Sequence, residues 1–336
     1  MMKKTAIALG IASMAFGAQA IEVFKNGDTA VEINIDMQFY NLSLVEAADG
    51  QARNYVRGDG TQLQFKTSKV IDADLTVFGQ IEFDSDPVGD DTTVLTDDMK
   101  FGLTSKTWGT IQMGQFDTFM EDDVMEIANS FLITGTSSPV TEPTAGNDGR
   151  HLAYKHKLGD FGFAVDWTSG YDAASSATDG TNGLALSANY TLGNLKLVAG
   201  SSTIARYKND YTTNSSKAAM GAGASYTLKS ESGTTKFAFL TATNTSYSTT
   251  AANDGLNTSI SHLSVHHTMG PWGLGVIGST VNYPTTSSKD SYTVQQSAFQ
   301  VVYDIGKGAK LYGANINKGV NGNKGNFAEV GFLMAF

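Results

Sequence analysis

The chain has 336 residues, of which 41% are hydrophobic, 33 are acidic and 23 are basic, so its net charge is −10. A chain with this acidic excess is a poor partner for nucleic acid, because phosphate binding requires clustered positive charge. The absence of cysteine excludes disulfides, thiolate metal sites and cysteine nucleophiles.

Residues 1–20 have the pattern of a secretory signal peptide. Lys3 and Lys4 precede a short apolar run, which ends in the small-residue sequence AQA. The alternative is a short N-terminal membrane anchor, but the apolar run is too short to span a bilayer. We predict export, cleavage after Ala20 and a mature chain of residues 21–336. Without the two leader lysines this chain has 21 basic and 33 acidic residues, a net charge of −12.

The first predicted strand covers residues 29–42. In TAVEINIDMQF the odd positions from Val31 to Phe39 are apolar, and the even positions are polar, including Glu32 and Asp36. A period of two indicates a strand with one apolar face and one polar face.

The same alternation recurs to the end of the chain, and short connectors alternate with long polar ones. This rhythm predicts an antiparallel meander with all long loops at one end. We predict sixteen strands, at residues 29–42, 59–68, 73–84, 98–105, 109–115, 151–158, 160–169, 182–191, 194–201, 218–229, 234–242, 258–269, 272–281, 292–305, 309–317 and 326–336.

The polar faces of these strands cannot form a protein core, since they include Gln64, Glu82 and Asp166. A closed barrel of this size can hold water inside. Its apolar positions would then face lipid, because in water they would form an exposed patch far larger than soluble monomers tolerate. We therefore predict an all-β transmembrane barrel. The alternative is a soluble β-sandwich with the apolar faces turned inward.

Aromatic residues near strand ends suit the interfacial girdles of such a barrel. They are Tyr40, Trp108, Phe161, Trp167, Tyr190 and Trp272.

Four segments resemble the general trimeric porins of Gram-negative outer membranes. They are IEVFKNGDTAVEI at 21–33, MKFGLTSKTWGTIQMGQFD at 99–117, HLAYKHKLGDFGFAVDW at 151–167 and EVGFLMAF at 329–336. The resemblance implies a sixteen-stranded barrel, a homotrimer, periplasmic short turns and a third loop folded into the pore. It also implies that Phe336 is part of the signal read by the barrel-assembly machinery.

The candidate third loop, residues 116–147, is the longest segment without a strand pattern, and its many apolar residues suit a loop tucked against the barrel wall. It also carries the acids Glu121, Asp122, Asp123 and Glu126. In a narrow water channel these acids would concentrate cations. The alternative is a solvated helix N-terminus, where acids favour the dipole.

In the porin family, basic residues on the opposite wall face the acidic loop. The positions that align with them here hold Asp36, Gln62 and Gln115, and Arg150 is a displaced counterpart of the family's arginine after the third loop. Lys66 and Lys100 are predicted to face inward and could substitute in part. An acidic loop opposed by a weakened basic wall predicts cation selectivity.

Other residue clusters give weaker predictions. His262, His266 and His267 do not share a face in a way that suits joint metal coordination, so we predict no metal site there. The acidic second loop offers a weak divalent-ion site at Asp84, Asp86, Asp90 and Asp91. None of the five histidines lies in a recognisable catalytic motif, so we predict no enzyme activity and no cofactor.

The sequence thus predicts an outer-membrane channel for passive diffusion of small hydrophilic solutes and ions, with lipopolysaccharide among its partners. Two alternatives stay open. One is a channel that prefers a single nutrient class, and the other is a surface receptor or adhesin that uses the long loops.

Overall fold

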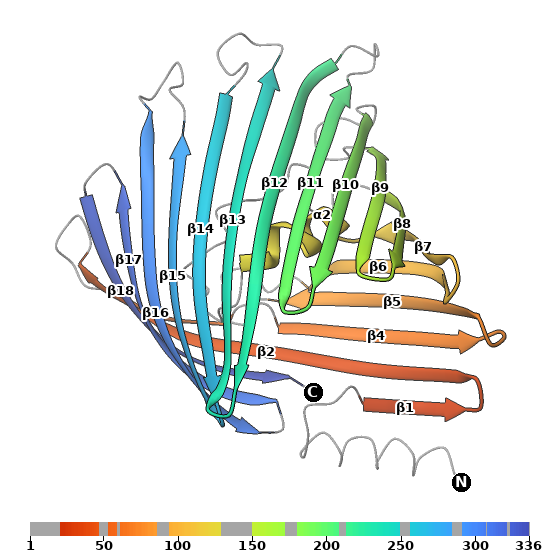
Figure 1. Ribbon diagram of the computed structural model, residues 1–336, viewed down its shortest axis with the longest axis horizontal. Coiled ribbons are helices and arrows are strands. Elements are labelled where there is room, and N and C mark those ends of the chain that lie inside the picture. The colour runs from red at the N-terminus through yellow and green to blue at the C-terminus, as the bar shows by residue number, and fades with distance from the viewer. Residues whose placement is uncertain are drawn as a thin grey trace.

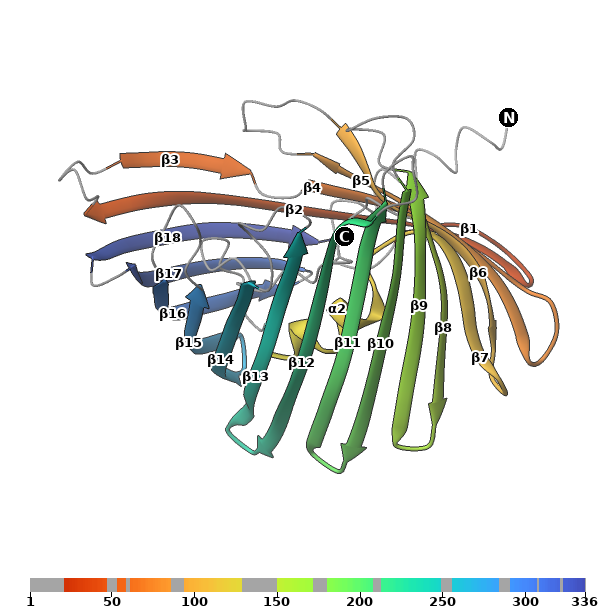
Figure 2. The ribbon, with the colours of Figure 1, turned by 90° about the horizontal axis from the view of Figure 1, so that it is seen from above.

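The computed structural model describes residues 21–46, 53–58, 61–85, 94–128, 150–171, 180–207, 213–248, 256–283, 291–306, 308–320 and 323–335. Almost all of these residues lie in antiparallel strands that curve around a common axis (Figures 1 and 2). Within the described ranges, no helix is long and apolar enough to cross a membrane. The predicted leader at 1–20 lies outside these ranges, and its cleavage stays a prediction.

The described residues form eighteen strands, one short α-helix and one 3-10 helix. The first nine strands are β1 (Ile21–Asn26), β2 (Thr29–Glu46), β3 (Arg53–Gly58), β4 (Thr61–Val70), β5 (Leu75–Ser85), β6 (Val94–Ser105), β7 (Gly109–Gln115), β8 (Arg150–Leu158) and β9 (Phe161–Tyr171). The remaining strands are β10 (Gly180–Leu192), β11 (Leu195–Tyr207), β12 (Thr213–Ser230), β13 (Gly233–Ser248), β14 (Leu256–Met269), β15 (Trp272–Tyr283), β16 (Tyr292–Gly306), β17 (Ala309–Val320) and β18 (Asn323–Ala335). The helices α2 (Phe119–Asp123) and η1 (Met125–Ala128) lie between β7 and β8.

The barrel is closed because β18 pairs antiparallel with β2, the first long strand. Strands β3 and β4 pair with successive parts of β2, opposite Phe39–Leu44 and Thr29–Asp36, so together they occupy one position in the wall. Strand β1 pairs with the start of β2. Counted this way, the wall has sixteen strands, and the prediction of a sixteen-stranded antiparallel barrel is confirmed.

The hairpin of β1 and β2 was not predicted. It has a clear place in the wall, because Ile21 pairs with Ile33 while Ala335 of β18 pairs with Asp36. Strand β1 therefore continues the line of β18 along the same edge of β2 (Figure 1). Its six residues are too few to show a period of two against background.

The predicted strand boundaries agree best with the structure at the strand ends next to short turns. Strand β7 has the predicted bounds, whereas β11 extends to Tyr207 instead of 201 and β13 to Ser248 instead of 242. The two extensions read STIARY and TNTSYS, so both are mostly polar and lack a regular apolar alternation. The backbone ladder continues beyond the apolar belt, because ladder hydrogen bonds do not depend on which side chains the strand carries.

The apolar faces of the strands point out of the barrel. Leu197, Met220 and Val276 are 43%, 62% and 54% exposed, while their strand neighbours Val198 and Ala219 are buried. A soluble sandwich would bury the large apolar residues instead, so that alternative is wrong. The predicted aromatic positions Trp108, Phe161, Trp167, Tyr190 and Trp272 belong to the exposed outer set.

Candidate functional site

Inside the barrel, α2 and η1 lie behind the wall formed by β10 to β12 (Figure 2). The helix begins after Thr118, whose side-chain hydroxyl accepts a hydrogen bond from the Glu121 backbone N–H at 3.4 Å. A threonine at this position satisfies one of the donors that a helix leaves free at its first turn. The described part of the candidate third loop, residues 116–128, is therefore a short helical segment on the inner face of the wall.

An apolar cluster fixes this segment to the inner wall. Met120, Val124 and Ile127 pack against residues of β10 to β15 that point inward. The wall contacts are Ala185, Val198, Ala219, Ala238, Leu240, Ala242, Ile260 and Val281. A Cβ atom on Gly223 would lie 2.7 Å from Ile127 Cγ2, so this glycine lets η1 approach the strand closely. The inward apolar residues of the wall thus form a packing surface for the loop. This contact explains why the loop carries so many apolar side chains.

Two hydrogen bonds also hold the loop segment against the wall. The Phe119 backbone N–H donates to Asp166 Oδ2 at 3.2 Å, and Ser264 Oγ donates to the Ala128 carbonyl oxygen at 2.8 Å. Asp166 is fully buried on β9. Since both bonds are buried and one has a carboxylate as acceptor, each should contribute more than an exposed hydrogen bond does.

The four predicted acids divide into two pairs. Asp122 and Glu126 are exposed to the interior of the barrel, whereas Glu121 and Asp123 are half-buried. Asp123 forms an ion pair with Lys155 of β8 at 3.1 Å, and the Lys155 ammonium lies 4.6 Å from the centre of the Phe119 ring. Asp122 and Glu126 therefore present their negative charges to the barrel interior.

The position of Asp122 changes its acidity. Shielding from bulk water inside the barrel, together with the charges of Asp117 and Glu126, raises the pKa of Asp122 to about 6, although Lys100 and Lys155 oppose the shift. Shielding and the Asp117 charge also raise the pKa of Glu126. Burial away from bulk water disfavours a charged carboxylate, and repulsion by neighbouring carboxylates adds to this effect.

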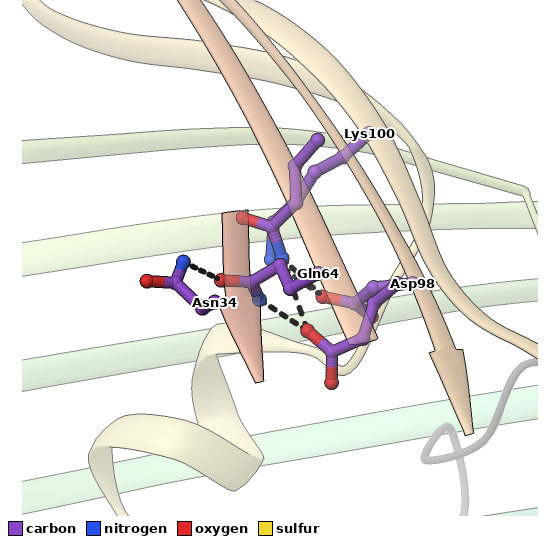
Figure 3. A network of polar contacts seen from close by, with 6 residues as sticks. Asn34, Gln64, Asp98 and Lys100 are labelled. Atoms are coloured by element: carbon purple, nitrogen blue, oxygen red, sulfur yellow. Dashed lines mark hydrogen bonds and ion pairs between the residues drawn. The ribbon is translucent and has the colours of Figure 1, made fainter. Parts of the chain in front are cut away.

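On β2, β4, β5 and β6, inward side chains form a polar network (Figure 3). Asn34 Nδ2 donates to Gln64 Oε1 at 2.9 Å, and Gln64 Nε2 donates to Glu82. The network continues through Gln80 and Asp98 to Lys100, whose ammonium lies 2.6 Å from Asp98 Oδ2. Its members are Asn34, Gln64, Gln80, Glu82, Asp98 and Lys100. Three amides, two carboxylates and one lysine therefore line this part of the wall, and the lysine charge is compensated.

Among the predicted wall residues, Asp36 and Gln62 are cross-strand partners, and Gln62 is in turn opposite Asp84. Lys66 lies opposite Glu32 on one side and Gln80 on the other. These residues share the inward face of the polar network.

Two predicted wall residues are placed differently. Arg150 begins β8 with an exposed side chain, on the same face as Leu152, which is 38% exposed on the outside. Gln115 ends β7 opposite Met99, which is 51% exposed on the outside. The register therefore brings neither residue into the group that faces the loop acids.

Three charged residues of the site were not predicted from the sequence, namely Asp98, Asp117 and Lys155. Asp98 shares the face of Lys100, and Lys155 shares the face of His151 and Ala153, so strand parity was the signal that could have identified both. Asp117 lies outside any strand. Only its spatial relation to Asp122 and Glu126 reveals its role.

The remaining predicted positions lie outside the site or outside the described residues. No group of three potential metal ligands occurs in the ranges given above. His267 bonds to Thr235 Oγ1 at 2.8 Å, while His262 faces inward and is buried. Asp86, Asp90, Asp91 and Phe336 fall outside the described ranges, so the weak ion site and the assembly signal stay predictions.

Comparison with known proteins gives one family and many similar structures. A family model described as Gram-negative porin matches residues 5–318. No curated protein sequence matches the chain.

Three similar solved structures share this fold at low sequence identity. Salmonella typhi OmpF in complex with daunomycin has a TM-score of 0.72 at 14% identity, covering 93% of this chain and 99% of that one. The trimer form of OmpT, an outer membrane protein of Vibrio cholerae, has a TM-score of 0.68 at 12% identity, with 92% and 99% covered. An anion-selective porin from Comamonas acidovorans has a TM-score of 0.68 at 13% identity, with 92% and 100% covered. At these identities the likeness shows the fold and leaves ion selectivity open.

Proposed function

Because the chain belongs to the Gram-negative porin family, it is an outer-membrane channel for passive diffusion, and we propose that this channel selects cations. The observation that carries the proposal is the charge balance across the barrel interior. Asp122 and Glu126 face the interior from the loop, and the polar network includes two carboxylates and one lysine.

The two lysines nearest the loop acids are each compensated by a carboxylate. Lys100 is paired with Asp98, and Lys155 is paired with Asp123, so each of these positive charges is compensated by a carboxylate in direct contact with it. A cation that passes between the loop and the network therefore meets excess negative charge in a water channel with low-dielectric walls. Such a geometry focuses the potential and raises the local cation concentration.

The proposed assembly is a homotrimer with its short turns in the periplasm and its long loops outside the cell. The trimer form of the Vibrio cholerae relative supports this proposal. Small hydrophilic solutes and ions would cross without a cofactor. Lipopolysaccharide and the barrel-assembly machinery are the further partners that an outer-membrane location implies.

Reversal potentials in planar bilayers test the proposal. With a salt gradient of KCl across the membrane, we expect the zero-current voltage to have the sign that marks potassium as the more permeant ion. A reversal potential of the opposite sign would refute cation selectivity while leaving the channel function intact.

The raised pKa of Asp122 predicts a pH dependence of ion selectivity. This carboxyl has a pKa of about 6, so it is charged at neutral pH and becomes neutral as the pH falls through that value. We expect the potassium-to-chloride permeability ratio to fall between roughly pH 8 and roughly pH 5, with part of the change centred near the pKa of Asp122. The Asp122→Asn variant should lack that component. Identical pH profiles in both proteins would contradict the assignment.

A further inference from the structure

A small cavity lies on the inner face of the wall, where β2, β4 and β5 run side by side (Figure 1). Its volume is about 160 Å³, and it is partly open to the channel. Its lining includes Ala30, Glu32, Lys66, Ser68, Phe78 and Gln80. These residues lie at even spacings along their strands from Asn34, Gln64 and Glu82 of the polar network, so they share its inward face.

The strand register places the charged residues of this cavity next to each other. Lys66 is the cross-strand partner of Glu32 on one side and of Gln80 on the other. In the next inward row toward the short turns, Ser68 and Phe78 are cross-strand partners. Side chains that are opposite each other on one face of a sheet are close enough to contact the same small ligand. The cavity therefore combines a charged row with a row that contains an aromatic ring.

Both charged groups of the cavity are available to a ligand. Within the described ranges, neither the Glu32 carboxylate nor the Lys66 ammonium forms an ion pair or a hydrogen bond. The charge of Glu32 acts on Lys25 of β1, but the Lys25 ammonium already contacts Glu22 Oε2 at 2.9 Å. An ion pair between Glu32 and Lys66 in contact with water would contribute little stability. A ligand that binds both groups would therefore displace only a weak interaction.

The Phe78 ring provides an apolar surface beside the charged row. Phe78 is half-buried, and its cross-strand partner on β6 is Gly102. A Cβ atom on Gly102 would lie 2.7 Å from Phe78 Cζ, so this glycine leaves room for the ring to lie against the wall. An aromatic ring held in this way can pack against the apolar part of a ligand whose charged groups bind Glu32 and Lys66.

We propose that this cavity binds small zwitterionic solutes, namely free α-amino acids with a short apolar side chain. The Lys66 ammonium would donate to the carboxylate of the solute, and the Glu32 carboxylate would accept from its ammonium. The apolar side chain of the solute would lie along the Phe78 ring. Because a cavity of roughly 150 Å³ can hold a benzene-sized molecule, a solute such as valine suits a cavity of this size that is partly open.

The pairing of charges defines the class of solute. Glu32 and Lys66 contribute one charge of each sign, so the site favours a solute that carries both charges over a simple cation or a simple anion. This inference is independent of the proposed cation selectivity, because it concerns a solute without net charge and different residues from the loop acids.

Saturation-transfer NMR of the full-length channel in detergent micelles, with L-valine as the probe, tests the proposal. We expect a saturable valine signal from wild type that micelles alone do not give. In Lys66→Gln and in Glu32→Gln, the half-saturating valine concentration should rise by about tenfold, since each variant loses one hydrogen bond to a charged group. Isobutylamine and isovalerate keep the branched chain of valine but carry only one of its charges. Each should bind wild type about tenfold more weakly than valine, for the same reason.

Two variants control for charge and for folding. Lys69→Gln removes a lysine from the same strand as Lys66, but from its opposite face, and should leave valine binding unchanged. Lys66→Arg keeps the charge and should retain binding. Equal valine binding in wild type and in both glutamine variants, or binding of the two single-charge analogues as tight as that of valine, would overturn the proposal. Neither outcome would alter the expected sign of the reversal potential.

Discussion

The Asp122→Asn/Glu126→Gln variant is expected to lose most of the cation preference of the channel. Both side chains are exposed to the interior, and the lysines close to Asp122 are already paired with other carboxylates. In a water-filled constriction each charge should stabilise a passing cation by about 0.5 kcal/mol after screening, so the two together contribute about 1 kcal/mol. The potassium-to-chloride permeability ratio should therefore fall by about fivefold, as measured by reversal potential.

The matched control is Asp160→Asn/Glu231→Gln. These two acids lie in exposed short turns, between β8 and β9 and between β12 and β13, so the variant loses the same formal charge away from the constriction. Its permeability ratio should stay within about twofold of wild type, because a charge beyond one Debye length is largely screened. Equal losses of selectivity in both double variants would show that net charge, and not the loop acids, controls permeation.

Replacing Val276 by arginine is expected to destabilise the membrane-embedded barrel strongly. Val276 lies near the middle of β15, is 54% exposed on the outer face and has Val265 and Phe299 as cross-strand partners. An arginine on the lipid face near the bilayer midplane costs about 2–4 kcal/mol. Refolding from urea into lipid vesicles should show this loss as a lower denaturant midpoint.

Val276→Ala separates the effect of charge from the loss of the side chain. Alanine removes apolar contact with lipid but introduces no charge, so we expect a cost of at most about 1.5 kcal/mol. If the arginine and alanine variants unfold at the same denaturant concentration, the outer face of β15 does not contact hydrocarbon.

Much of the barrel could be predicted from sequence because its constraint is local. In strands such as β7 and β15, one face must be apolar and the other polar, and a period of two records this directly. The turns between β10 and β11 and between β16 and β17 are short and contain glycine, which fixed those strand ends closely. The polar extensions of β11 and β13 could not be predicted, since they lie outside the apolar belt.

The candidate site was predicted only in part because it depends on contacts between distant segments. The loop acids stood out as a cluster, and the apolar residues of the loop indicated packing against a wall. The pairing of Asp123 with Lys155 joins two segments separated by a long connection, which no local pattern records. Arg150 and Gln115 were assigned by alignment with family positions, and a register difference of one residue places a side chain on the opposite face.

The most direct test of the inside-out barrel uses two neighbouring residues of β11, since a strand directs adjacent side chains to opposite faces. Lys196→Cys should react with a membrane-impermeant thiol reagent in lipid vesicles, whereas Leu197→Cys should react only with a lipid-soluble one. Equal reaction of both cysteines with the impermeant reagent, or a reversed pattern, would contradict a water-filled interior surrounded by a lipid-facing apolar surface.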